Sequence, residues 1–340
     1  MVPECHTGNA VADIACRGYN IASRGSKQRH MAAEEYFSKN YQSARAKFLA
    51  ACRELRLHPT AIRMPDGPQE PEPPLVDCLR LGSPSATRLL VICGGDRKTD
   101  ALCCSAVETG WLREFGTANL PSDTAIVLLH HGTAPETGGE VPGAGGTPPQ
   151  WEDDLLAKVE ERYAEYARQH GIDASGAPLG EPTDGDVPGY PGRILDMLAH
   201  TVSRTADKIA FIEIRVGAGP WGQAELTPCH PPNSANARRA RQWFTLPNPS
   251  DDDTPGTREL DSLGVGLRRR FPQADITAAS ASFGTYSMQS VLESLAARPE
   301  GKSIPETGAM VYPEDPNWRE AVWRSAIVVI QRALTGLRAK

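Results

Sequence analysis

The chain has 340 residues, of which 40% are hydrophobic and 23% charged, which is enough to bury one large α/β core or two smaller ones. A formal net charge of -6 argues against a protein built mainly to bind nucleic acid. No apolar run approaches the roughly 18 residues of a membrane-spanning helix, so we expect no membrane association either.

The first thirty residues predict an extension outside the folded part. They lack the apolar core of a signal peptide, which is roughly 7–15 residues long, and they show neither helical nor strand periodicity. We therefore expect residues 1–30 to be disordered and residues 31–340 to form a single domain. The sequence leaves both Met1 and Met31 open as the start of the protein.

Strands and helices alternate in the first half of the chain. Hydrophobic spacing and glycine or proline turns predict a helix over 32–57, strands over 75–82 and 88–95, a helix over 99–114 and a strand over 123–132. The last of these strands has a continuous apolar run, which is typical of a strand buried on both faces.

The alternation continues in the second half. We expect helices around 151–166, 193–205 and 235–244, strands over 208–217 and 275–286, and a closing helix from Pro316 onward. This order of elements predicts an α/β fold, a single three-layer α/β/α sandwich with a mixed, mostly parallel central sheet.

The cysteines and the arginine clusters favour ordinary structural roles. None of the eight cysteines forms a Cys-x-x-Cys pair, so zinc-finger and thioredoxin-like sites are excluded. Without a secretory signal we expect reduced thiols and a cytoplasmic location. The clusters at 238–241 and 268–270 are interpreted as solvent-exposed faces rather than as anion sites.

Short segments in a characteristic order lie between residues 35 and 338: YFSKNYQSARAKF, VICGG, SAVETGWL, LPSDTAIVLLHH, GAGPWGQAEL, ARRARQWF, SFGTYSMQSVLESL and DPNWREAVWRSA. In these segments the chain resembles a bacterial branch of the zinc carboxypeptidase-like superfamily, whose members are mostly of unknown function. The resemblance implies a carboxypeptidase-like fold and hydrolysis of an amide bond. The zinc ion would be held by two histidines and a glutamate, with a second glutamate as general base.

The positions that would carry this chemistry hold other residues. After the second strand, Arg97 stands where the resemblance implies a histidine, and Asp100 stands where it implies a glutamate. Arg215 takes the place of the second histidine. Ser282 occupies the position of the general base. Arginine offers no lone pair to zinc, and serine transfers a proton only beside an activating base. We therefore predict a catalytically inactive homologue without zinc or another cofactor.

Two interpretations of the altered site follow. The favoured one is a structural Arg–Asp–Arg bridge at the former zinc position, where removal of one member would leave an uncompensated charge. In the other, the two arginines and the Ser282 hydroxyl bind a small carboxylate or phosphate, or a protein partner, through charge-assisted hydrogen bonds. Glu213 and Glu225 flank Arg215 in the sequence and are expected to be its partners rather than catalysts.

Alternatives with other residues stay open. His130 or His131 could bind a metal together with Cys103, although neighbouring residues on a strand face opposite sides. Cys103 or Cys104 could be a nucleophile with His130 as its base, but core packing is the more ordinary role of such cysteines. The alternative function is thus an active hydrolase with atypical metal ligands or with a repurposed, metal-free site.

Overall fold

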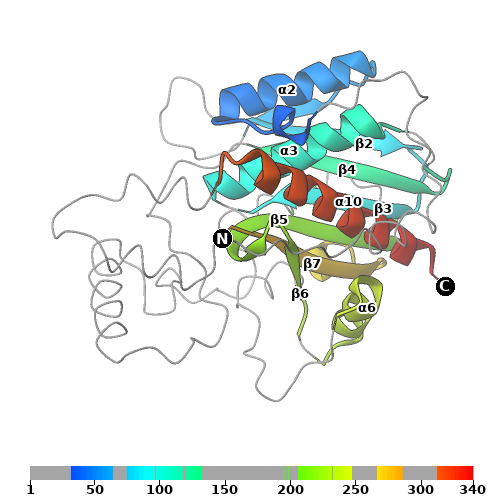
Figure 1. The fold of residues 1–340 in the computed structure, drawn as a ribbon. Helices are drawn as coiled ribbons and strands as arrows, with labels where there is room; N and C mark the ends of the chain where they lie inside the picture. Colours follow the sequence, from blue (N-terminus) through cyan, green and yellow to red (C-terminus); the bar gives the residue numbers. More distant parts are fainter. Residues whose placement is uncertain are drawn as a thin grey trace, which may run out of the picture.

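The computed structural model describes residues 32–63, 75–95, 97–117, 120–131, 195, 198, 206–231, 233–246, 266–285 and 312–339. Within these ranges the chain forms a central sheet with helices packed against it (Figure 1). The predicted extension over 1–30, the helix around 151–166 and most of the helix over 193–205 lie outside the described residues. The single domain over 31–340 therefore stays a prediction.

The described residues form one seven-stranded sheet in the order β1-β2-β4-β3-β5-β7-β6. The strands are β1 (Thr60–Arg63), β2 (Leu75–Gly82), β3 (Arg88–Gly94), β4 (Thr124–His131), β5 (Lys208–Trp221), β6 (Ala224–Pro228) and β7 (Asp275–Gly284). The central strands β4, β3, β5 and β7 are parallel, and β2 and β6 run against them. The predicted mixed, mostly parallel sheet is confirmed.

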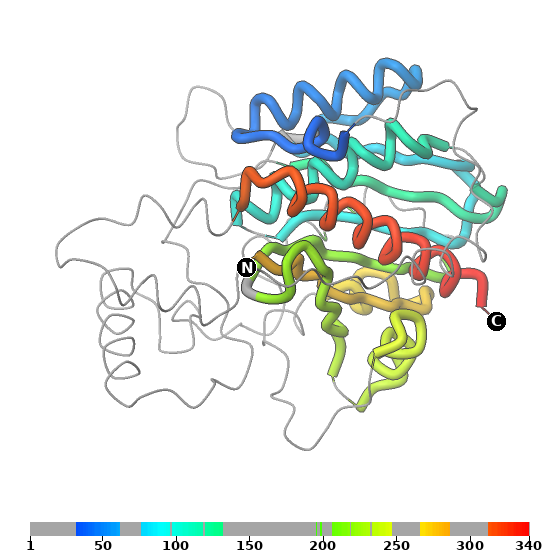
Figure 2. The backbone as a smooth tube through the Cα atoms, in the orientation of Figure 1, coloured from blue at the N-terminus to red at the C-terminus, as the bar shows by residue number. Residues whose placement is uncertain are grey.

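Three helices lie against one face of this sheet, α2 (Tyr41–Glu54), α3 (Lys98–Glu114) and α10 (Pro316–Arg338), as Figures 1 and 2 show. A short 3-10 helix, η1 (Ala33–Glu35), contacts α10, and α6 (Ala235–Phe244) packs against β7 and α10. Their apolar side chains share one core with the strand residues that point to this face. None of the described helices has the length and apolar character needed to cross a bilayer.

A second core covers the opposite face. Leu195 and Leu198, which are helical, and Leu267 and Phe271 at the short helix over 266–270 pack with the strand residues of that side, Phe211 among them. Because both faces are covered, the central strands are continuous apolar runs, LLVIC in β3 and IVLL in β4. The predicted three-layer α/β/α arrangement is confirmed.

Helix α2 begins nine residues later than the sequence predicts. Asn40 has an extended backbone, and its side-chain oxygen accepts the N–H of Ser43 at 2.9 Å, so it acts as the N-cap. The residues before it form η1 instead, and Tyr36 and Phe37 there are buried. The predicted helix over 32–57 therefore combined two elements that a capping residue separates.

The sequence analysis did not predict the two edge strands. β1 has only four residues, and β6 alternates between partly buried and exposed positions over five residues, so neither has an apolar run. β5 also continues beyond the predicted end, to Trp221, through an irregularity between Gly217 and Trp221. These additions matter because β6 lies beside β7, next to the carboxyl ends of the central strands.

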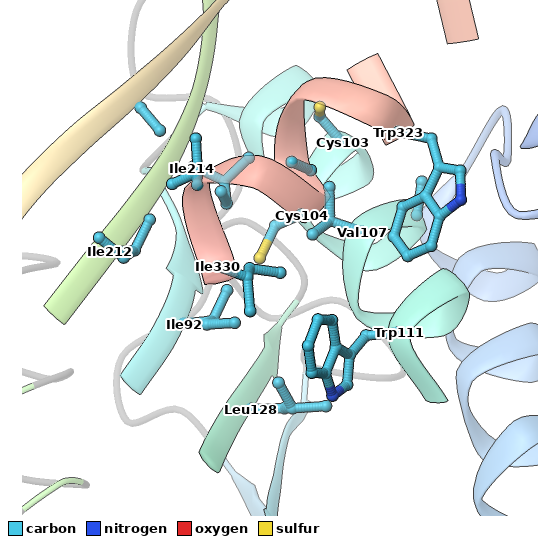
Figure 3. Close-up of a cluster of buried hydrophobic side chains, with 14 of the residues drawn as sticks. Ile92, Cys103, Cys104, Val107, Trp111, Leu128, Ile212, Ile214, Trp323 and Ile330 are labelled. Atoms are coloured by element: carbon cyan, nitrogen blue, oxygen red, sulfur yellow. The ribbon is translucent and has the colours of Figure 1, made fainter. Parts of the chain in front are cut away.

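Helix α3 is the centre of the first core. Every residue from Thr99 to Leu112 is buried, since the helix lies between the sheet, α2 and α10. Figure 3 shows Cys103 and Cys104 among apolar side chains such as Ile92 and Ile330. The tight fit fixes the N-terminus of α3, which carries two of the candidate site residues.

Candidate functional site

The candidate residues lie where the carboxyl ends of the parallel strands meet. Arg215 on β5 lies one residue beyond the last pair of β5 with β3, and it is the direct neighbour of Ser282 on β7 in the strand register. Asp100 is in the first turn of α3 and Arg97 is the N-cap residue of this helix, shortly after the end of β3. In open α/β sheets ligands bind at this edge. The structure therefore brings all four residues to one region of the fold.

Arg97 and Asp100 form a bidentate ion pair. Arg97 Nε donates to Asp100 Oδ2 at 3.0 Å, and Arg97 Nη2 donates to Oδ1 at 2.9 Å. Asp100 Oδ1 also accepts the backbone N–H of Val216 at 2.8 Å, and the Arg97 guanidinium donates to the Val216 carbonyl. The side chain of Asp100 is 0% exposed and that of Arg97 21%. The pair thus ties the start of α3 to the backbone of β5.

The position of Asp100 in the helix adds to the stability of this arrangement. It lies in the first turn of α3, where a negative charge interacts favourably with the helix dipole. Both of its oxygens are engaged, one by two donors and the other by one. A carboxylate held in this way is a poor ligand for any further cation.

Gly95 makes room for the pair. A Cβ at this glycine would lie 2.5 Å from Asp100 Oδ2 and 3.2 Å from Cγ of Arg215. The Asp100 carboxylate and the stem of Arg215 therefore converge on the same point above the end of β3. Any side chain at residue 95 would push the carboxylate away from its donors.

Arg215 has an ion-pair partner of its own. Its Nε donates to Glu213 Oε2 at 2.8 Å, and its Nη2 donates to Glu213 Oε1 at 3.3 Å. Glu213 was one of the two glutamates expected as partners. In place of one Arg–Asp–Arg bridge, the structure has two ion pairs side by side, Arg97 with Asp100 and Arg215 with Glu213. The four charges cancel.

The two adjacent histidines do not share a site. His130 faces the first core, where its ring stacks on Phe48 at 4.5 Å between centroids and its Nε2 lies 2.9 Å from Ser105 Oγ. Burial lowers the pKa of His130 to about 3, so its imidazole is neutral. His131 faces the opposite side, with Nε2 3.2 Å from the carbonyl oxygen of Gly94. The opposed orientation agrees with strand geometry.

Ser105, His130 and Asp77 stand in the order of a hydrolytic triad, but they lack its geometry. His130 Nδ1 is 3.9 Å from Asp77 Oδ2, which is beyond hydrogen-bond distance, and Asp77 is held by Arg45 at 2.6 and 2.9 Å. All three members of the set are buried beneath α2. We interpret the set as a structural network that ties α2 to β2, β4 and α3.

The cysteines at α3 have the properties of core residues. Burial raises the pKa of both the Cys103 and the Cys104 thiol well above the usual range, so neither is a thiolate near neutral pH. The His130 nitrogen that would serve as base contacts Ser105 instead. The geometry therefore gives no support to a cysteine nucleophile or to a metal site with Cys103.

Zinc, which the sequence resemblance implies, does not fit the residues at this edge. Two of the three positions that the resemblance assigns to zinc ligands present guanidinium groups, which have no lone pair, and both oxygens of the third, Asp100, already accept hydrogen bonds. Within the described part of the chain, no group of three or more His, Cys, Asp or Glu side chains is arranged to hold a metal.

Sequence reasoning missed the contributions of Gly95 and Val216. The glycine after the β3 run VICG was visible as a signal of close backbone approach, whereas the role of the Val216 backbone depends on the sheet register. Glu225, the second glutamate expected as a partner of Arg215, lies opposite Ser282, because β6 pairs antiparallel with β7. The ion pair of Arg215 is with Glu213. The sequence analysis did not predict β6.

The sequence matches one family model, described as protein of unknown function (DUF2817), over residues 37–134 and 185–325. The matched residues make up more than half of the chain. This agrees with the unknown-function branch that the sequence resemblance pointed to. No curated protein matches the sequence.

The fold also resembles solved structures at low sequence identity. Bovine thrombin-activatable fibrinolysis inhibitor, solved with tick carboxypeptidase inhibitor, is 10% identical with a TM-score of 0.42, over 89% of this chain and 98% of that one. Glutaminyl cyclase of Porphyromonas gingivalis is 10% identical with a TM-score of 0.40, over 95% and 96%. Cytosol aminopeptidase of Coxiella burnetii is 14% identical with a TM-score of 0.38, over 86% of this chain and 66% of its own length.

Proposed function

Since the chain belongs to the family described as protein of unknown function (DUF2817), we propose a function from the site itself. We propose that this protein is a non-hydrolytic homologue of the zinc carboxypeptidase-like enzymes that uses the strand-end site for binding. The scaffold that positions such a site is retained, and a fold persists independently of the chemistry it once carried.

The state of Asp100 is the observation that carries this proposal. It is the only carboxylate among the three former ligand positions, and it is buried with both oxygens bound by Arg97 and the Val216 N–H. A zinc ion would have to displace two guanidinium donors and one backbone donor. It would then lie beside two permanent positive charges.

The ion pair also supplies a structural role that a metal ion would otherwise have. It links the first turn of α3 to β5, two elements that are far apart in the sequence. Breaking a buried ion pair by removing one partner costs about 3–5 kcal/mol. The site is therefore stable without any bound cation.

An anionic ligand, one of the classes expected from the sequence, has to compete with partners already present. Arg97 is paired with Asp100 and Arg215 with Glu213, so a carboxylate or phosphate would have to separate an existing ion pair. We therefore do not extend the proposal to an anion.

Hydrolysis assays test the proposal. The purified protein is incubated with a panel of peptides and N-acylated amino acids, with added zinc and, separately, with chelator. We expect no turnover above the uncatalysed rate in either condition. Turnover that requires zinc and disappears with chelator would contradict a non-hydrolytic role.

A further inference from the structure

A row of three polar side chains crosses the sheet at the candidate site. Arg215 on β5 is the register neighbour of Ser282 on β7, and Ser282 is the register neighbour of Glu225 on β6. Residues that pair directly across neighbouring strands project to the same face. A guanidinium, a hydroxyl and a carboxylate thus occupy successive strands at one edge of the sheet.

Glycines leave the backbone of β5 bare beneath this row. A Cβ at Gly217 would lie 3.1 Å from Ser282 Oγ, and a Cβ at Gly219 would lie 3.5 Å from the carboxylate carbon and from Oε2 of Glu225. The hydroxyl and the carboxylate therefore both lie over β5, the strand that carries Arg215. Both groups lie beside the same glycine segment of β5, at positions open to solvent.

The backbone around these groups is held in place by hydrogen bonds. The Gly217 carbonyl accepts from the N–H of Thr285 at 2.9 Å and from its hydroxyl at 3.1 Å. The Gly284 carbonyl accepts from the Gly222 N–H at 2.7 Å and from Trp318 Nε1 at 2.8 Å. A fixed backbone reduces the entropy lost when a ligand binds.

The charged side chains near this row differ in whether they have an ion-pair partner. Arg97 and Arg215 each have a carboxylate partner, whereas Glu225 is exposed and forms no ion pair with the residues that the structure describes. A carboxylate without a cationic partner favours a cationic group in the ligand.

We propose that Glu225 and Ser282 form a binding site for a primary ammonium group. The inference rests on the proposed function, because it names the ligand class of the same site. An ammonium group carries three donors on one atom, and it can give charge-assisted hydrogen bonds to Glu225 while donating to the Ser282 hydroxyl. One carboxylate and one hydroxyl are too few for Ca²⁺, which takes six to eight oxygen ligands.

Titration with n-butylammonium chloride tests this site. Amide signals of the isotope-labelled protein are followed by NMR, with sodium acetate and inorganic phosphate titrated at the same ionic strength. We expect saturable shifts at Gly217 and Gly219 with n-butylammonium only. Glu225→Gln should weaken that binding by about tenfold or more, the effect of losing a charge-assisted hydrogen bond. Glu34→Gln, the same change at an exposed residue of η1, should leave it unchanged.

The outcomes separate this inference from the proposed function. Saturation by acetate or phosphate instead of n-butylammonium would overturn the ammonium site, and so would the absence of saturation with all three probes. Equal binding to wild type and to Glu225→Gln would also overturn it. Zinc-dependent hydrolysis would overturn the non-hydrolytic role, and the two failures are observed in different assays.

Discussion

Replacing Asp100 by asparagine perturbs the candidate site at its most buried charge. Asparagine has nearly the same shape and keeps a side-chain oxygen for the Val216 N–H, but it cannot neutralise Arg97. Breaking a buried ion pair costs about 3–5 kcal/mol, and since Arg97 is 21% exposed we expect the lower end, about 3 kcal/mol. The measurement is the free energy of unfolding by urea at pH 7, compared with wild type at equal m-value.

A double-mutant cycle provides the control. Arg97→Met leaves the Asp100 carboxylate buried without its partner and should be as destabilising as Asp100→Asn. The double variant should be less destabilised than the sum of the two, because neither charge is then left alone. If Asp100→Asn lies within about 0.5 kcal/mol of wild type, the usual range for a surface substitution, the reasoning about the ion pair is refuted.

Three further predictions follow from the packing and the buried titratable groups. Gly95→Ala should destabilise the protein by about 1–3 kcal/mol, since its Cβ would lie 2.5 Å from Asp100 Oδ2. A free energy of unfolding equal to that of wild type would show that the site can accommodate a methyl group at this position. Burial raises the pKa of Glu108 well above its usual range, so the folded protein holds a proton that the unfolded chain releases above about pH 4.5. Stability should therefore fall as pH rises through this window, and Glu108→Gln should stabilise the protein at pH 7, whereas a loss of stability would contradict the assignment. Burial lowers the pKa of His130 to about 3 and of His230 to about 4, so stability should fall below about pH 6.5, where the unfolded chain takes up protons that the folded chain excludes. At pH 5 each histidine should lower the free energy of unfolding by about 2 kcal/mol. His230→Gln keeps an acceptor for the Ala278 N–H and should remove the part of this pH dependence that comes from His230. An unchanged pH profile in that variant would count against a neutral, buried His230.

The central strands of the fold were predictable because burial on both faces requires a continuous run of apolar residues, which is visible in the sequence. The apolar runs of β3 and β4 and the strand starts at Lys208 and Asp275 lie where the sequence predicts them. The start of α2 was not predictable from hydrophobic spacing alone, because it depends on the capping role of Asn40. The short strands β1 and β6 lack an apolar run, and only their pairing partners define them.

The sequence predicted which residues lie at the candidate site, but it did not predict which of them form ion pairs with one another. The resemblance identified Arg97, Asp100 and Arg215 by position, and the structure brings them to one edge of the sheet. The division into two ion pairs depends on Glu213, which the alternation of β5 places on the same face as Arg215. Glu225 was expected beside Arg215, but its position opposite Ser282 could not be predicted without β6, since it is a consequence of the antiparallel register.

Zinc content is the measurement that tests the central claim most directly. The protein is expressed in zinc-supplemented medium, dialysed without chelator and analysed by elemental mass spectrometry. The two ion pairs predict a folded protein with a zinc content near zero. A content near one zinc per chain would contradict the proposal that guanidinium–carboxylate pairs stand in place of a metal at the positions that the resemblance assigns to zinc ligands.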